Sequence, residues 1–418
     1  MKIWFTEIGE PLPLEPDARL LRYGQISRQL ARRGHAVTWW SSTFLHARKR
    51  HIADRDGVYD TEGVTLRLLH GPGYERNVSL ARIRHQRAFA QSFAGAAADQ
   101  SPPDIIISPV PTIEVATEAI RYGRRVGVPV LIDIRDEWPD EFLLPLPKVL
   151  RPLGRLALTP YYRMMRTVCR NAATIIGVSE RQLGYGLRFA DRPRGPLDRV
   201  IAHGYSAEPV SPEALAAAQA WWAERGVAPG PITACFFGTL GTVFNIDLVI
   251  AAVRRLAGKI DLRVVICGDG PARPTFERQA ADLPNVVFPG WVNNSQIAAL
   301  MAMSDIGLAP YGPSDDKRMS LPNKPFEYMA GGLPILSSIE GELVDLLRTH
   351  DCGVNYDPRS IEALCDGFLF LAEDAERRHA MGARGRALFL TEFSHQRIVD
   401  GFEALCEDVL RRRQPAGR

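Results

Sequence analysis

Short apolar runs alternate with longer amphipathic stretches along most of the chain. Residues 104–110 (DIIISPV) and 129–134 (PVLIDI) are nearly continuous apolar runs, which is typical of strands buried on both faces of a parallel sheet. Residues 18–35 and 113–125 instead repeat their apolar positions with a helical period, and Gly34 is a suitable end for the first of these helices. The alternation predicts βαβ units and therefore an open, doubly wound sheet.

The alternation begins a second time in the latter half of the chain. In the first series, we expect strands at 2–8, 36–42, 64–70, 104–110, 129–134, 172–179 and 199–205, with helices at 18–35, 79–98 and 113–125. In the second series, we expect strands at 232–241, 262–271, 285–290, 306–311 and 334–338, with helices at 246–257, 295–304, 323–330, 342–349, 359–371 and 374–392 and a helical tail at 394–412. A polar, proline-punctuated region, 206–231, separates the two series.

The length agrees with two domains. A chain of 418 residues is longer than one hydrophobic core usually holds. We predict an α/β protein with two Rossmann-like domains, at residues 1–210 and 211–390, and a C-terminal helix within 391–418 that packs back toward the first domain. Ligands of such sheets bind beyond the carboxyl ends of the strands, so we expect the two domains to face a central cleft.

Charge is distributed unevenly along the chain. Residues 1–210 contain 30 Lys and Arg against 22 Asp and Glu, whereas the remaining residues contain 21 against 26. The basic first half favours an anionic surface or substrate, or it is simply a solvated basic face. No stretch approaches the roughly 20 apolar residues of a membrane-spanning helix, and the apolar start before Glu7 is too short for a signal peptide.

One segment of the first half combines basic and apolar residues. Residues 144–170 (LPLPKVLRPLGRLALTPYYRMMRTVCR) interleave Leu, Tyr and Met with five Arg and one Lys. This pattern suits a membrane interface or a polyprenyl-diphosphate acceptor, and it equally suits an amphipathic helix whose Arg face lies in water. We therefore expect a cytoplasmic protein that is either soluble or peripheral on the cytoplasmic face of the inner membrane.

A glycine-rich turn follows the first strand of the second series. Its residues are Gly238, Thr239, Leu240 and Gly241 (GTLG). Glycines let the backbone come close to a ligand, and free N–H groups in such a turn can hold a phosphate. Glycine also ends strands in many α/β proteins for purely structural reasons. The sequence has no GxGxxG in the first βα turn, which weighs against a dinucleotide fingerprint.

The helix expected at 323–330 begins with an unusual set of residues. Asn323 is a good N-cap, and Lys324 adds a positive charge at the helix end that is already positive. This small cost is explained if an anion such as a diphosphate binds there. Glu327, one turn further on, can then accept from a sugar hydroxyl. The alternative is a solvated Lys and a Glu that simply favours a first turn.

Several motifs, in order, resemble those of family 4 glycosyltransferases. The stretch SLPNKPFEYMAGGLPILSS (320–338), together with FFGTLG, ICGDGP, FPGWV and MSDIGLAPY, looks like the C-terminal half of that family. LARRGHAVTWWSSTF, PVLIDIRDEWPD, TIIGVSE and VIAHGY fall in the order of its N-terminal half. The resemblance covers roughly residues 1–390 and implies a GT-B fold and transfer of a sugar from a nucleotide sugar with retention of configuration. The branch it most resembles assembles bacterial O-antigen, capsule and exopolysaccharide.

The resemblance carries over unevenly to single residues. Glu327 matches the second glutamate of the family's two-glutamate motif, which binds the donor ribose, but position 319, eight residues earlier, is Met. The Arg and Lys that usually neutralise the diphosphate fall at about Thr239 and Phe244, so both are missing. Lys324 is the nearest substitute, with Lys317 and Arg318 behind it in the sequence.

The first half also departs from the family pattern. The family often has a His-Asp pair where this chain has Arg135-Asp136, and its Gly-Gly loop after the first strand is replaced by GEPLPLEPDAR (9–19). The resemblance implies that Asp136 orients or contacts the acceptor, and that Arg135 contacts either a phosphate or the acceptor. Alternatively, the two form a structural ion pair.

The resemblance implies a retaining, metal-independent glycosyltransferase. Lys324 would stabilise the leaving diphosphate, and Gly238, Thr239, Leu240, Gly241, Asn323, Lys324 and Glu327 would hold a donor, UDP-linked by expectation. The acceptor would be a glycan or a lipid-linked glycan, and no nucleic acid, cofactor or metal is expected. The alternatives are another GT-B enzyme, such as a sugar epimerase or phosphorylase, and a non-catalytic nucleotide-sugar-binding subunit.

Overall fold

The computed structural model describes residues 1–14, 20–77, 79–205, 210–313 and 322–413. Two compact units share the chain. Unit 1 comprises Met1–His203 and His395–Arg418, and unit 2 comprises Gly204–Ser394. The chain therefore passes from one unit to the other twice. The two passages are adjacent, because Tyr205 pairs with Ser394 in an isolated bridge and its N–H donates to the Phe393 carbonyl (3.1 Å).

Unit 1 is built on an eight-stranded sheet in the order β10-β9-β8-β7-β1-β2-β6-β5. Its strands are β1 (Lys2–Thr6), β2 (Ala36–Ser42), β5 (Gly57–Thr61), β6 (Val64–Leu69), β7 (Ile105–Val110), β8 (Val130–Ile134), β9 (Thr174–Gly177) and β10 (Arg199–Val200). All neighbours pair in parallel except the edge hairpin β5-β6. A separate two-stranded sheet pairs β3 (Phe44–Leu45) with β4 (Arg50–His51).

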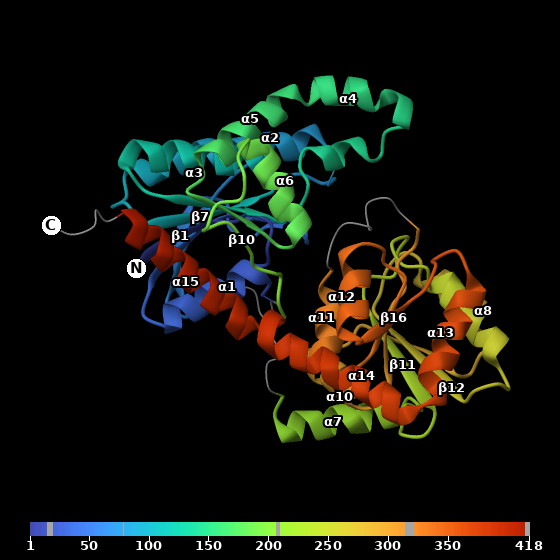
Figure 1. The fold of residues 1–418 in the computed structure, drawn as a ribbon. Helices are drawn as coiled ribbons and strands as arrows, with labels where there is room; N and C mark the ends of the chain where they lie inside the picture. The colour runs from blue at the N-terminus through green and yellow to red at the C-terminus, as the bar shows by residue number, and fades with distance from the viewer. Residues whose placement is uncertain (15–19, 78, 206–209, 314–321, 414–418) are drawn as a thin grey trace. The chain divides into compact units, whose positions relative to one another are not determined.

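Helices cover both faces of this sheet (Figure 1). On one face lie α2 (Leu80–Ala98), α3 (Ile113–Val126), α5 (Thr159–Asn171) and α6 (Glu180–Ala190), and on the other lie α1 (Arg22–Arg32) and α15 (His395–Arg413). Between β8 and α5 the chain forms short turns η1 (Asp140–Leu143) and η2 (Lys148–Leu150) and the helix α4 (Arg151–Ala157). The segment 144–170 is thus two helices and a turn rather than one helix.

The helix α15 completes unit 1 from the far end of the sequence. The Arg33 guanidinium, just after α1, forms ion pairs with Asp400 (2.7 Å) and Glu403. On the same face the Arg22 guanidinium lies 5.0 Å from the ring centre of Phe402. Residues nearly 400 positions apart therefore close one layer of this unit.

Unit 2 is a second parallel sheet, in the order β13-β12-β11-β14-β15-β16. Its strands are β11 (Ile232–Phe237), β12 (Leu262–Cys267), β13 (Val286–Gly290), β14 (Ile306–Ala309), β15 (Ile335–Ser337) and β16 (Gly353–Asn355). Its helices are α7 (Pro212–Ala223), α8 (Ile246–Leu256), α9 (Arg273–Gln279), α10 (Asn294–Ala302), α11 (Asn323–Ala330), α12 (Glu342–His350), α13 (Ile361–Glu373) and α14 (Ala375–Leu388), followed by a π-helical turn, η3 (Phe389–Phe393). The fold class predicted from the sequence is confirmed.

The region 206–231 is not only a linker, as the sequence suggested. It contains α7, whose Ser211 cap accepts from the Ala214 N–H, and whose Trp222 is completely buried. The Trp222 indole N–H donates to the Gln296 carbonyl (2.8 Å) on α10. Half of the residues of α7 are alanine, and only Ala218 and Trp222 are buried, so the sequence carries little hydrophobic period to detect.

Candidate active site

Two glycine turns of unit 2 lock together at the carboxyl ends of their strands. The Leu240 N–H, after β11, donates to the Asp269 carbonyl (2.9 Å), after β12, and the Ala272 N–H donates to the Leu240 carbonyl (3.0 Å). Gly268 has φ +128°, and a Cβ at this position would overlap the Gly238 carbonyl oxygen. The backbones can approach this closely because Gly268 lacks a side chain.

The four residues of the GTLG turn are not equivalent. The Leu240 side chain is buried in the core of unit 2, so only its backbone faces the turn. Thr239 is exposed, and its carbonyl accepts from the Gly241 N–H (3.1 Å). A Cβ added at Gly241 would meet nothing within 4 Å, which leaves room for a ligand beside the turn.

Lys324 lies directly against this turn. A Cβ at Gly238 would lie 2.9 Å from the Lys324 Cε and 3.0 Å from its Nζ. The same ammonium group lies 4.4 Å from the ring centre of Phe244 and 5.6 Å from that of Phe236. Two ring faces thus hold the cation beside the GTLG backbone. The structure therefore brings Lys324 and Gly238 together from positions 86 residues apart in the sequence.

Asn323 does not cap the helix, contrary to the prediction. Pro322 occupies the cap position in extended conformation, with no capping side chain, and Asn323 is the first residue of α11. Proline can take this position because its fixed φ is compatible with an extended cap. Among the residues that the structure describes, no side chain caps the first N–H groups of α11, which is the arrangement that anion sites at helix ends share.

Glu327 is buried on α11, with 6% of its surface exposed. Burial, and next the Glu327 charge, raise the pKa of the neighbouring Tyr311 hydroxyl. The helix carrying Glu327 is fixed to β14, because the Tyr328 hydroxyl donates to the Leu308 carbonyl (2.8 Å). Gly307 allows this contact, since a Cβ there would overlap the Tyr328 ring. Lys324 and Glu327 are thus presented by a firmly packed helix.

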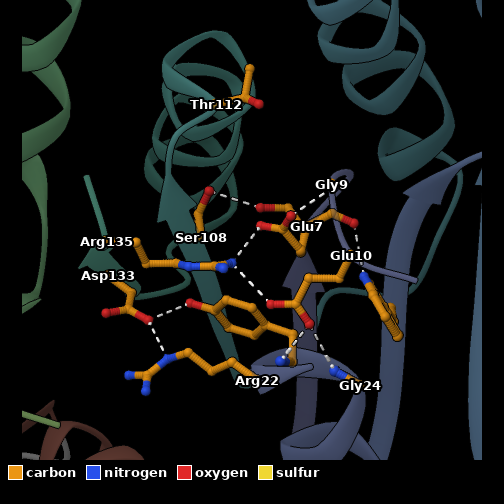
Figure 2. A network of polar contacts seen from close by, with 12 residues as sticks. Glu7, Gly9, Glu10, Arg22, Gly24, Ser108, Thr112, Asp133 and Arg135 are labelled. Carbon is orange, nitrogen blue, oxygen red and sulfur yellow. Dashed lines mark hydrogen bonds and ion pairs between the residues drawn. The ribbon is translucent and has the colours of Figure 1, made fainter. Parts of the chain in front are cut away.

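The corresponding edge of unit 1 is rich in carboxylates. Figure 2 shows Arg135, just after β8, reaching toward Glu7 and Glu10 in the loop after β1. An Arg135 guanidinium nitrogen lies 2.9 Å from Glu10 and 3.4 Å from Glu7. Glu7 also accepts from the Gly9 N–H (2.6 Å). Arg135 is therefore enclosed by two buried acids.

Glu10 links this network to a helix. Its second oxygen accepts from the N–H groups of Tyr23 (2.8 Å) and Gly24 (3.3 Å), at the start of α1. A carboxylate at this position satisfies unpaired N–H groups and complements the helix dipole. One residue thus anchors both Arg135 and α1.

A second ion pair lies deeper beneath the same edge. Asp133, in β8, accepts from the Arg22 Nε (3.0 Å) and from the Tyr23 hydroxyl (2.6 Å). Arg22 also donates to the Ile201 carbonyl (2.8 Å). All three side chains are buried, which indicates a structural role.

Two further acids lie at this edge, Asp136 beside Arg135 and Glu141 beside Asp136. Burial raises the pKa of Asp136, against the lowering effects of Arg135 and Arg82. Burial, and next the Asp136 charge, raise the pKa of Glu141 to about 7. Burial likewise raises the pKa of Glu7 to about 7, although Arg135 opposes it. Acids with such values can donate or accept hydrogen bonds near neutral pH.

Sequence reasoning identified Arg135 and Asp136 but missed Glu7, Glu10 and Glu141. The one signal for Glu10 was the loop GEPLPLEPDAR (9–19), which replaces the family's Gly-Gly turn with acids and prolines, and nothing marked Glu7. Nothing in the spacing of Glu141 marked it, because its proximity to Asp136 depends on the turn η1.

Aromatic rings and histidines extend this edge of unit 1. The Arg82 guanidinium lies 5.0 Å from the ring centre of Trp138 and 5.9 Å from that of Tyr74. Beyond Tyr74, the Thr43 hydroxyl lies 2.9 Å from the His51 Nδ1 and 3.1 Å from the His70 Nδ1. Within the described ranges, no group of three His, Cys, Asp or Glu is arranged to hold a metal ion. Asp315 and Asp316 lie outside those ranges, as do Lys317, Arg318 and Met319.

Two doubly wound units on one chain, each with polar groups at the carboxyl ends of its strands, define a GT-B protein. The chain matches the family model "Glycosyl transferase 4-like domain" over residues 22–200 and the model "Glycosyl transferases group 1" over residues 218–388. The chain belongs to the family 4 GT-B glycosyltransferases, as the sequence motifs indicated.

Two relatives of known activity show how far the sequence similarity extends. N-acetyl-alpha-D-glucosaminyl L-malate synthase of Bacillus anthracis is 25% identical over 45% of this chain and 48% of its own length. The GDP-mannose-dependent alpha-(1-6)-phosphatidylinositol dimannoside mannosyltransferase of Mycobacterium tuberculosis is 31% identical over 40% of this chain and 42% of its own length. The similarity thus spans a little less than half the length of each relative.

The structural similarity extends over the whole chain. HepE of Anabaena, solved in complex with UDP, matches with a TM-score of 0.67 and 16% identity, over 98% of this chain and 100% of that one. At this identity the likeness establishes the fold alone.

Proposed function

We propose that this protein is a retaining glycosyltransferase that moves a hexosyl group from a nucleotide-diphosphate sugar to a hydroxyl of its acceptor. The observation that carries this proposal is the position of the Lys324 ammonium, 3.0 Å from the place of a Cβ on Gly238 and at the start of α11. A cation, a helix N-terminus and a glycine turn converge there, and together they suit a diphosphate.

The donor lies on unit 2 in this proposal. Lys324 and the first N–H groups of α11 stabilise the diphosphate as it leaves, and the GTLG backbone lies along its other side. Asn323 stands at the same helix end, and Glu327 accepts from a ribose hydroxyl. The positive charge comes from the chain itself, so the proposed reaction is metal-independent. The donor phosphate takes the acceptor proton on the face that the leaving group vacates, so the configuration is retained.

We propose UDP as the nucleotide. HepE, which shares the fold over the full chain, binds UDP, whereas the mycobacterial relative uses GDP-mannose. UDP and GDP differ in the base, so measuring the affinity of this protein for each nucleotide decides between them.

The acceptor lies on unit 1 in this proposal. Asp136 contacts and orients the acceptor hydroxyl, because it is the acid next to Arg135 that has no part in the Glu7–Glu10 clamp. Arg135 positions the loop that carries these acids.

We further propose a glycan or a polyprenyl-diphosphate-linked glycan as the acceptor. The protein would work in bacterial surface-polysaccharide assembly, on the cytoplasmic face of the inner membrane. Support comes from the order of the sequence motifs and from the relative that acts on a phosphatidylinositol mannoside.

A panel of UDP- and GDP-linked sugars tests the proposal. The purified protein should slowly hydrolyse one of them to free nucleotide, and NMR of the released sugar should show the donor's anomeric configuration. Lys324→Ala should abolish this turnover, and Lys259→Ala, an exposed lysine of the same unit, should not. Interconversion of sugars without transfer would instead indicate an epimerase, and binding without turnover would indicate a non-catalytic subunit.

A further inference from the structure

Four large apolar side chains are exposed together on unit 1. They are Val149 (82% exposed), Leu150 (44%), Leu153 (65%) and Leu156 (72%), all within the η2–α4 segment, residues 148–157. The exposed large hydrophobics in the described part of the chain number eleven, and the other seven are scattered over both units. Single exposed apolar residues are ordinary, but a cluster of four indicates an interaction surface.

The cluster has a helical spacing. Val149, Leu153 and Leu156 stand at i, i+4 and i+7, which places them on one side of a helix. None of the residues of α4 is buried, so this side has no core of its own unit beneath it. In Figure 1, α4 lies on the outside of unit 1, beyond α5.

The opposite side of α4 is held against the rest of unit 1. A Cβ on Gly154 would lie 2.7 Å from methyl groups of both Leu143 and Leu146, so glycine lets the helix pack closely there. The preceding turn is fixed as well, because Asp140 accepts from the hydroxyls of Tyr162 (2.5 Å) and Tyr185 (2.8 Å). The exposed cluster is thus presented by a supported segment and not by a loose loop.

The charge within the segment that carries the cluster has one sign. Residues 144–170 include five Arg and one Lys but neither Asp nor Glu. Lys148, Arg151 and Arg155 follow the apolar stripe at i, i+3 and i+7, so a basic stripe runs beside it. On α5 the exposed Arg163 and Arg166 continue the basic surface. Only Arg170, at the far end, forms an ion pair among those recorded for this segment, with Asp191 (2.6 Å).

We propose that the η2–α4 segment docks on an anionic lipid bilayer by inserting Val149, Leu150, Leu153 and Leu156 below the headgroups. Lys148, Arg151 and Arg155 then lie at the level of the lipid phosphates. An apolar stripe beside a basic one, without acids, matches such an interface. A protein partner fits less well, since residues 144–170 carry charges of one sign and no acid to define a register.

This inference deepens the proposed function and rests on it in one respect, namely that the acceptor is lipid-linked. Docking through unit 1 brings the acceptor-binding unit to the membrane where such an acceptor resides. It differs from purely electrostatic adsorption, because inserted side chains are not screened by salt.

Vesicle flotation of the full chain tests the inference. Wild-type protein should float with vesicles of phosphatidylcholine and phosphatidylglycerol, less with phosphatidylcholine alone, and in part still at high salt. The variant L153E/L156E should lower the partition coefficient at least about tenfold at both salt concentrations. The variant K148Q/R151Q/R155Q should lose the salt-sensitive part and keep the salt-resistant remainder.

A matched control adds the same charges elsewhere. Val58 and Leu390 are 56% and 55% exposed, and V58E/L390E should float as the wild type does. Equal flotation of L153E/L156E and wild type would overturn the inference. A second result would also overturn it. If the wild type does not bind anionic vesicles but self-associates by light scattering, and L153E/L156E does not self-associate, the cluster binds a second copy of the chain.

The assay contains no nucleotide sugar, so it separates the two proposals. A wild-type protein that transfers sugar but does not float with vesicles would refute only the membrane contact. Normal flotation without nucleotide-sugar turnover would refute the proposed transferase activity and the lipid-linked acceptor, but not the bilayer contact.

Discussion

One positively charged residue in each unit lies near the carboxyl ends of the strands, and the surroundings of the two residues differ. Arg135 of unit 1 is enclosed by Glu7 and Glu10, whose side chains are 6% and 1% exposed. Lys324 of unit 2 is recorded against two aromatic faces and the backbone of a glycine turn. The strand ends of a doubly wound sheet can therefore use a cation in two ways. In unit 1 the cation neutralises the protein's own acids, and in unit 2 it stands beside a backbone suited to an anionic ligand.

Arg135→Ala should have the largest effect, and the effect should be on stability. Removing the guanidinium leaves Glu7 and Glu10 buried without their partner, which typically costs about 3–5 kcal/mol. Chemical denaturation measures the loss. Adding Glu10→Gln should restore part of it, because one buried charge is removed. A fully stable Arg135→Ala protein would show that the acids are satisfied without it.

Lys324→Ala should act on the ligand instead. One charge-assisted contact to the diphosphate is lost, so nucleotide binding should weaken by about 1.5–3 kcal/mol while stability changes little. Titration calorimetry with UDP and with GDP measures the first quantity, and thermal melting measures the second. If Lys324→Ala binds and turns over the donor as wild type does, the diphosphate is held elsewhere and the comparison between the two cations fails.

The stability of the protein should fall between about pH 4.5 and 7. Glu7 and Glu141 have pKa values of about 7 in the folded protein, above their ordinary value of 4.5, chiefly because of burial. Over this interval the unfolded chain loses the protons that the folded one keeps. Their contribution, about 3 kcal/mol each, is thus full below pH 4.5 and lost above pH 7. The free energy of unfolding, measured by chemical denaturation across this pH range, should change less with pH for Glu7→Gln than for the wild type. An unchanged pH dependence would contradict the assignment.

Glu327→Gln should have the smallest effect. The amide keeps an acceptor oxygen and nearly the same shape at this buried position, but loses the charge that strengthens a bond to a ribose hydroxyl. Nucleotide affinity should drop by about 1 kcal/mol, roughly fivefold. Comparing ribose with 2′-deoxyribose nucleotides checks the cause, because the variant should discriminate between them less than wild type does. Equal discrimination would place the ribose away from Glu327.

The sequence predicts the scaffold better than the site, for physical reasons. Strands such as β7 and β8 are continuous apolar runs, because both faces of a parallel sheet are buried, and this signal is local. Lys324 and Gly238 were expected to hold one donor, and the structure places them side by side. The clamp of Glu7 and Glu10 on Arg135 was not, since it joins residues about 125 positions apart and depends on the path of an irregular loop.

Two local sequence signals also misled the prediction of helices. Asn323 was expected to cap α11, but Pro322 takes the cap position and leaves Asn323 within the helix. The helix α7 was hidden by its alanines, and only the burial of Trp222 reveals what holds it. In both places the sequence admitted more than one structure, and tertiary packing selected between them.

The double passage of the chain between units determines the order in which the protein can assemble during synthesis. Unit 2 is a continuous stretch, Gly204–Ser394, whereas unit 1 needs α15, from the last part of the chain, to supply Phe402, Asp400 and Glu403 to Arg22 and Arg33. Domains generally fold as units as they leave the ribosome. The sheet of unit 1 therefore emerges first but waits with its α1 face uncovered, while unit 2 emerges and folds. The half of the protein that is made first is the half that is finished last.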